Sequence, residues 1–222
     1  MADRFSNRTD AGQRLATALV GYSGRDDVTV LGLPRGGVPV AFEIASALDA
    51  PLDVFLVRKL GLPGHEEFGI GAIASGGIRV VDESVLSTYG VTPETLDRIT
   101  EREQRELERR EKLYRDDRPP PAIRDRVVIL VDDGLATGST MRAAIAALRV
   151  EGPREIVVAV PVGATETCAA ISGLTDKLIC LATPDPFNAV GLWYDNFDQT
   201  EDSEVHELLE RAASRATRAR ID

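Results

Sequence analysis

Residues 127–140, with the sequence VVILVDDGLATGST, pass from an apolar run through two aspartates into a loop of small residues. The apolar run has the length of a strand that is buried on both faces, and residues 139–150 follow the pattern of a helix. A strand, a short loop and a helix in this order form the repeating unit of a parallel sheet covered by helices. The segment therefore predicts an α/β architecture.

The same alternation recurs along the chain. Strands are expected at 28–33, 52–57, 127–131, 155–160 and 178–182, and helices at 10–20, 38–48, 139–150 and 164–172. Asp10 is expected to cap the first helix. A length of 222 residues with 43% hydrophobic content suits one substantial core. We predict one doubly wound domain over residues 1–222, with a mainly parallel sheet and its ligand at the carboxyl ends of the strands.

The loop after residue 131 offers groups that suit a sugar phosphate. Ionised Asp132 and Asp133 can accept hydrogen bonds from a vicinal diol. Two glycines allow backbone N–H groups to face an anion, and the following helix adds its positive N-terminal end. The residues expected around the phosphate are Gly134, Leu135, Ala136, Thr137, Gly138, Ser139 and Thr140. A diol and a phosphate together indicate a ribose 5-phosphate, whereas a simple helix cap would need only one carboxylate.

Residues 128–140 also closely resemble the 5-phosphoribosyl 1-pyrophosphate (PRPP) signature of type I phosphoribosyltransferases: four apolar residues, two acidic ones, and a small-residue loop ending in Thr-Gly. The resemblance implies transfer of the phosphoribosyl group from PRPP to a nitrogenous base, with release of pyrophosphate. It also implies Mg²⁺, held mainly through PRPP and water rather than by direct protein ligands. Family enzymes for hypoxanthine or guanine usually have an aspartate at the position of Ala136, so a standard 6-oxopurine acceptor is disfavoured.

A second loop supports this resemblance. Pro34, Arg35, Gly36 and Gly37 follow the expected strand 28–33, where the family places a pyrophosphate-binding loop. The glycines would let the backbone approach an anion, and Arg35 would add a charged fork. With Asp132 and Asp133, Arg35 completes the predicted catalytic set. Taken alone, a Gly-Gly turn between a strand and a helix is more often just a turn.

Residues 58–121 form an expected insertion. Arg58 and Lys59 directly follow the strand 52–57 and are predicted to contact pyrophosphate; the alternative is that they are solvated charges at a strand end. Segments 69–74 and 78–82 predict a β-hairpin, which in the family closes over the substrate. A charged helix is predicted at 92–117. It would lie solvated on the domain, or contact a second subunit in a homodimer.

The C-terminal segment, residues 183–222, is expected to form a small hood over the acceptor, as variable segments do in the family. Trp193 and Tyr194 are the predicted acceptor-binding residues, because aromatic faces stack on flat heterocycles. The alternative is that these aromatic side chains attach a tail helix, predicted at 201–213, to the sheet.

Composition narrows the class of protein. A formal net charge of −10 argues against a nucleic-acid or acidic-membrane surface. Two cysteines, Cys168 and Cys180, are too few and too far apart in sequence for a zinc site or a disulfide framework, so they are expected to be reduced core thiols. Without a long apolar run, the protein is expected to be cytoplasmic. The predicted partners are PRPP and a small base; the alternative is a regulatory protein of the same fold that senses PRPP or a nucleotide.

Overall fold

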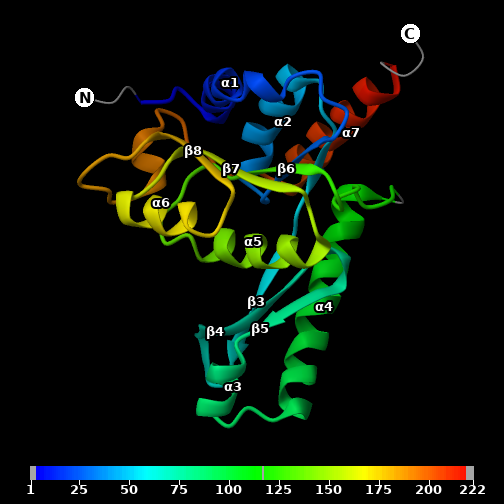
Figure 1. Cartoon of the computed structure of the whole chain (residues 1–222), viewed down its shortest axis with the longest axis vertical. Helices are drawn as coiled ribbons and strands as arrows, with labels where there is room; N and C mark the ends of the chain where they lie inside the picture. The colour runs from blue at the N-terminus through cyan, green and yellow to red at the C-terminus, as the bar shows by residue number, and fades with distance from the viewer. Residues whose placement is uncertain (1–3, 117, 219–222) are drawn as a thin grey trace.

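The computed structural model describes residues 4–116 and 118–218, except for the side chains of residues 66, 67 and 216–218. Its centre is a five-stranded parallel sheet with the order β2-β1-β6-β7-β8 (Figure 1). The strands are β1 Val28–Gly32, β2 Leu52–Val54, β6 Val127–Val131, β7 Glu155–Val162 and β8 Lys177–Ala182. The predicted α/β fold with a mainly parallel sheet is confirmed.

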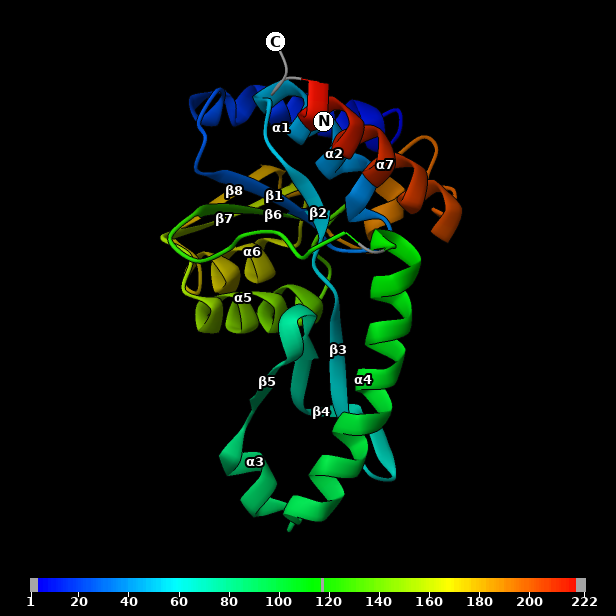
Figure 2. The ribbon, with the colours of Figure 1, turned by 90° about the vertical axis from the view of Figure 1, so that its right-hand side faces the viewer.

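Helices cover both faces of this sheet (Figures 1 and 2). On one face lie α1 Arg8–Ala18, α2 Gly37–Leu48 and α7 Asp202–Arg218, and on the other lie α5 Ser139–Glu151 and α6 Thr165–Ser172. Short 3-10 turns occupy Val20–Tyr22 and Val190–Trp193. In β6, Val128 and Leu130 join the core under α5, while Ile129 faces the core under α1 and α2. Burial on both faces explains why β6 is apolar at every position.

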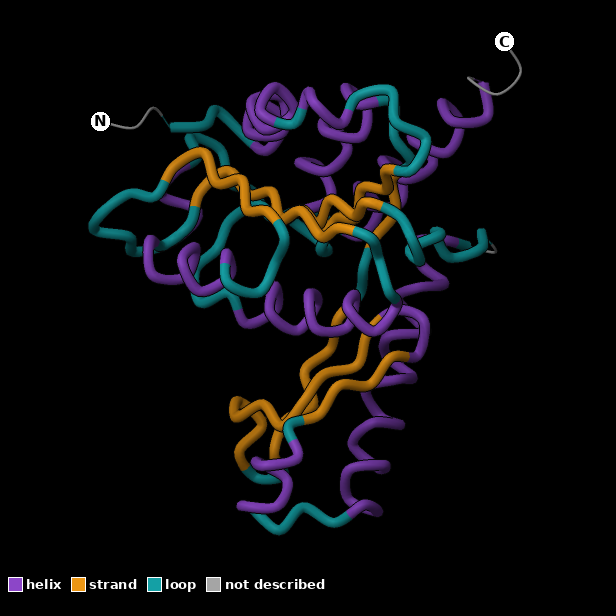
Figure 3. Tube along the Cα trace, viewed as in Figure 1, coloured by secondary structure: helices purple, strands orange, loops and turns teal. Residues whose placement is uncertain are grey.

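The predicted insertion forms a lobe, residues 57–115, that projects from the side of the sheet covered by α5 (Figures 1 and 3). Three antiparallel strands with the order β3-β4-β5 make its sheet. The lobe comprises β3 Val57–Leu62, β4 His65–Ala74, the turn Ser75–Gly77, β5 Ile78–Val81, α3 Glu83–Thr88 and α4 Pro93–Arg115. The predicted hairpin and the long helix are both confirmed, although residue 117 lies outside the described residues.

The strand expected at 52–57 is present only over 52–54, and its predicted end is wrong. β2 ends at Val54, the chain crosses at Phe55 and Leu56, and β3 then begins in the other sheet. Phe55 is buried in the main core and Leu56 in the core of the lobe. Because the apolar run continues across the crossing, hydrophobic periodicity could not reveal the break.

Helix α4 packs on its own chain rather than standing free. Its apolar stripe is buried against the lobe strands and α7, and comprises Leu96, Ile99, Leu107 and Tyr114. On its outer face Glu106 pairs with Arg110 at 2.8 Å. This arrangement matches the interpretation of a helix that lies on the domain, and the homodimer remains a prediction.

Two cysteine thiols meet despite their separation in sequence. Cys168 of α6 and Cys180 of β8 are both free, and their sulfur atoms lie 3.5 Å apart. The prediction of thiols in the core region is confirmed, but separation along the chain was a poor guide to distance. Among the described residues, no helix combines the length and the apolar character needed to cross a membrane.

Candidate functional site

The loop between β6 and α5 is held in place at one buried residue, while several of its other residues are exposed to solvent. Leu135 is buried, and its backbone joins β7, donating to Val162 and accepting from Ala164 at 2.9 Å each. The flanking Ala136, Thr137, Ser139 and Thr140 are exposed. Gly138, at φ 69°, turns the chain into α5 without a side-chain cap. The first N–H groups of α5 therefore face an accessible loop, which is the arrangement that binds a phosphate.

The loop of Arg35 to Gly37 packs directly against the aspartate pair. A Cβ atom on Gly36 would lie 1.9 Å from Oδ2 of Asp133, and one on Gly37 would lie 2.6 Å from the carbonyl oxygen of Val131. Both glycines are thus required for the contact between two loops that follow neighbouring strands β1 and β6. The two loops predicted from the sequence to share one ligand are brought together.

Burial works against the predicted ionisation of the two aspartates, and it does so unequally. Burial raises the pKa of Asp132 well above its ordinary value, and the charge of Asp133 raises it further. Burial also raises the pKa of Asp133, but the guanidinium of Arg8 opposes this shift. Asp132 is therefore the member of the pair that holds a proton more readily, because Arg8 stabilises the charge on its neighbour. The sequence showed two adjacent carboxylates but not their burial.

Arg8 is a site residue that sequence analysis missed. Its Nε and Nη2 atoms lie 2.9 and 2.8 Å from Oδ2 of Asp133. The same guanidinium donates to the carbonyl of Asp198 at 2.7 Å and stacks 4.0 Å from the ring centroid of Phe197. Arg8 begins α1, where Asn7 is the cap: its side chain accepts from the N–H of Asp10, so the predicted cap at Asp10 is wrong. No local sequence signal could identify a partner 125 residues away.

The three predicted basic contacts have separate surroundings. Arg35 points toward the start of α7, with its Nη1 atom 3.7 Å from Glu201. Arg58 donates from Nε to Glu103 of α4 at 2.8 Å. Lys59, the next residue, faces α5 and shares a groove with Ser139. Arg58 and Lys59 were predicted to lie just after a strand, but both residues lie inside β3. Their contact with pyrophosphate stays a prediction.

The two predicted acceptor-binding aromatics differ in exposure. The Tyr194 ring is 2% exposed, packs between Phe5 and Phe197, and donates its hydroxyl to the carbonyl of Asp133 at 2.7 Å. No face of Tyr194 is free for a base, so its role is to attach the hood to the β6 loop. Trp193 is half-buried, and its contact with an acceptor stays a prediction. Val190 also covers the loop, since a Cβ on Gly134 would lie 2.5 Å from its Cγ1.

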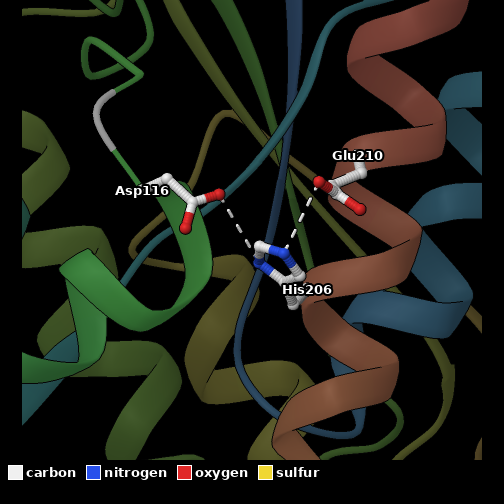
Figure 4. A group of neighbouring side chains, drawn as sticks. All are labelled: Asp116, His206 and Glu210. Atoms are coloured by element: carbon white, nitrogen blue, oxygen red, sulfur yellow. Dashed lines mark ion pairs between the residues drawn. The ribbon is translucent and has the colours of Figure 1, made fainter.

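A second polar cluster joins the end of α4 to α7 (Figure 4). Nδ1 of His206 lies 3.8 Å from Asp116, and Nε2 lies 3.6 Å from Glu210. The two carboxylates face opposite nitrogens of one ring, whereas a metal ion would use a single nitrogen with both carboxylates. The geometry of this cluster therefore does not suit a metal centre.

The loop at the start of α5, the carboxylate pair and the glycine loop lie together at the carboxyl edge of a parallel sheet, which is where α/β proteins of this architecture place their ligands. The sequence model of the phosphoribosyl transferase domain matches residues 3–192. The chain belongs to this family, which confirms the resemblance of residues 128–140 to the type I signature.

Relatives and solved structures agree with this assignment. A protein of Mycobacterium tuberculosis (strain CDC 1551 / Oshkosh), named as a phosphoribosyl transferase, is 45% identical over 208 residues, covering 94% of this chain and 47% of that protein. The chain thus spans about half the length of the curated relatives it matches first. The crystal structure of TT1426 from Thermus thermophilus is 42% identical, with a TM-score of 0.84, covering 94% of this chain and 98% of that one. The bifunctional protein PyrR of Clostridium acetobutylicum is 32% identical, covering 62% of this chain and 58% of its own length.

Proposed function

We propose that the chain is a Mg²⁺-dependent phosphoribosyltransferase that transfers the 5-phosphoribosyl group of PRPP to a nitrogenous base and releases pyrophosphate. The observation that carries the proposal is the contact between Gly36 and the carboxylate of Asp133, which unites the two loops. One loop would hold the 5-phosphate and the other the pyrophosphate, so the two ends of PRPP have adjoining sites. Membership of the family supports the same reaction.

The ribose diol would bind at the aspartate pair. Oδ1 of Asp132 accepts from the N–H of Asp133, and Oδ2 of Asp133 is held by Arg8. Among the described residues, the other oxygen of each carboxylate receives no side-chain hydrogen bond, which leaves one oxygen per aspartate for a hydroxyl. Because each hydroxyl of a diol both donates and accepts, the pair suits it even when Asp132 is protonated.

The donors present fit a magnesium ion that arrives on its substrate. Mg²⁺ prefers six oxygen ligands, and the two unpartnered carboxylate oxygens are too few for a cage made of protein alone. Diphosphate oxygens of PRPP and water would supply its ligands, and Asp132 and Asp133 would hold it indirectly, through the ribose hydroxyls that they bind. When bound, the ion would neutralise charge that develops on the departing pyrophosphate.

The chain's own residues would contribute positioning and charge. The loop residues 134–140 would fix the phosphate, and Arg35 would reach the pyrophosphate. Closure of the lobe over the ligand would keep water from the oxocarbenium-like centre at C1. Since Ala136 offers no carboxylate to handle a purine N7 proton, we propose an acceptor other than a 6-oxopurine.

Incubation with labelled PRPP, Mg²⁺ and a panel of bases, followed by measurement of pyrophosphate, tests this proposal. Release that depends on one base supports it. Tight PRPP binding without release for any base would instead favour the alternative of a regulatory protein that senses PRPP. Absence of PRPP binding would refute both.

A further inference from the structure

A groove of about 750 Å³ separates the sheet of the lobe from helix α5. Its α5 wall is a single stripe of Ser139, Arg142, Ala143 and Ala146, spaced as neighbours on one helical face. At the other end of α5, the two walls touch: a Cβ on Gly76 of the hairpin turn would lie 2.7 Å from Glu151. The groove is therefore a wedge that opens beside the phosphate loop. Figure 1 shows α5 between the parallel sheet and the strands of the lobe.

Small residues make up part of both walls of the wedge. Gly69, Gly71 and Ala72 of β4 and Ala143 and Ala146 of α5 line it, together with the larger Ile70, Val80 and Val81. Small side chains leave a flat, largely apolar space between a sheet and a helix. Its volume falls within the range of about 300 to 1,000 Å³ that is typical of small-molecule sites.

Two cations line the groove. Lys59 projects into it from β3 and Arg142 from α5. Among the side chains that the structure describes, neither forms an ion pair; Arg142 donates only to the carbonyl of Thr137, at 3.2 Å. Acidic residues outnumber basic ones by 36 to 26 in this chain, so two cations in one groove with no ion pair to any described side chain are unexpected unless they serve an anion.

Carboxylates lie at the opposite edge of the same groove. Asp82 and Glu83 line it from the end of β5, and β4 separates β5 from the strand of Lys59. Neighbouring strands are about 4.8 Å apart, so the two edges lie about 10 Å from each other. Oδ1 of Asp82 accepts from the N–H of Ser84 at 3.0 Å. No described residue donates to the other oxygen of Asp82 or to the Glu83 carboxylate, so these oxygens are available to a donor on a ligand.

We propose that this groove binds a nucleoside monophosphate that carries an exocyclic amino group. Its phosphate would meet Lys59 and Arg142, its base would lie on the glycine and alanine walls, and its amino group would donate to the edge at Asp82. Helix α5 runs back from the carboxyl end of β6, so the groove leads away from the C1 end of PRPP. The groove adjoins the phosphate loop and shares Ser139 with it, and Lys59 would serve the nucleotide phosphate here rather than pyrophosphate. Its occupancy does not depend on the reaction proposed above.

Calorimetry without PRPP tests the site with four probes: AMP, IMP, adenosine and inorganic phosphate. AMP is expected to bind with saturation, and IMP, whose carbonyl replaces the amino group, about tenfold more weakly or worse. Adenosine lacks the phosphate, and inorganic phosphate lacks the base with its amino group. Both are expected to bind at least as weakly as IMP.

Substitutions locate the binding. Ala146→Leu fills the groove and is expected to weaken AMP at least about tenfold, since overpacking excludes the ligand. The matched control is Val150→Leu, on the next turn of α5 at a residue that is 62% exposed and outside the groove; it should bind AMP normally. Arg142→Gln, at an exposed side chain, gives a second test if Ala146→Leu melts early.

Three results would overturn the proposal. The first is the absence of saturable AMP binding to the wild-type chain. The second is unchanged AMP affinity in Arg142→Gln and in a folded Ala146→Leu. The third is evidence that AMP occupies the PRPP site. Loss of AMP binding in the double variant Asp132→Asn with Asp133→Asn would show this, as would competition between AMP and PRPP combined with unchanged AMP affinity in the groove variants.

Discussion

Replacement of Gly36 by alanine tests whether the two loops must touch for PRPP to bind. The new Cβ would lie 1.9 Å from Oδ2 of Asp133 and 2.6 Å from its Cγ, about 1 Å closer than real contacts allow. The carboxylate cannot simply retreat, because Arg8 holds the same oxygen at 2.8 Å. Either the glycine loop or the aspartate must therefore move by about 1 Å.

A displacement of about 1 Å in a preorganised site can cost about 100-fold in rate, and we expect a similar loss in PRPP affinity for Gly36→Ala. Overpacking should also cost about 1 to 3 kcal/mol of stability, equivalent to a fall of roughly 2 to 12 °C in Tm for a chain of this length. Calorimetry with PRPP and Mg²⁺, pyrophosphate release and thermal melting measure these effects. Gly21→Ala is the control, because nothing lies within 4 Å of its added Cβ. Wild-type Tm and PRPP affinity in Gly36→Ala would refute the argument.

Three further predictions concern the same site. Asp132→Asn with Asp133→Asn should weaken PRPP binding in calorimetry while the circular dichroism of the fold is kept; unchanged affinity would contradict the diol assignment. Burial raises the pKa of Asp132 in the folded state, so wild type loses stability as pH rises from the unfolded pKa of this carboxyl to its raised, folded pKa. Asparagine does not titrate, so the Tm of Asp132→Asn relative to that of wild type should increase with pH. A constant difference in Tm across melts from about pH 4 to 8 would argue against a raised pKa. Trp193→Ala should raise the acceptor KM by about 5- to 150-fold with normal PRPP binding if the indole stacks on the base; a lowered Tm with parallel loss of every activity would show a packing role instead.

The parts of the site that are continuous in sequence could be predicted, because local patterns specify them. Residues 127–140 carry their own strand, loop and helix signals, and the structure places all of these elements as expected. Arg8 could not be predicted, since its contact with Asp133 depends on how α1 returns across the sheet. The aromatic residues of the hood were predicted as a group, but only packing separates the buried Tyr194 from Trp193.

The protonation of the aspartate pair was also beyond the sequence. In a sequence, adjacent aspartates are equally consistent with two exposed, ionised carboxylates and with a buried pair that carries a single negative charge. The depth of Asp132 and the position of Arg8 set the direction in which each pKa moves, and both follow from tertiary structure.

The route of the chain from β2 to β3 has a consequence for how such proteins can diverge. Only Phe55 and Leu56 connect the two strands, and β3 then directs Arg58 toward α4 and Lys59 toward α5. Because side chains alternate along a strand, adding or removing one residue in this connection would exchange the two cations between opposite walls. Homologous chains that keep both cations should therefore tolerate replacement of Phe55 or Leu56 by other apolar residues, but not a change in the number of residues between the strands.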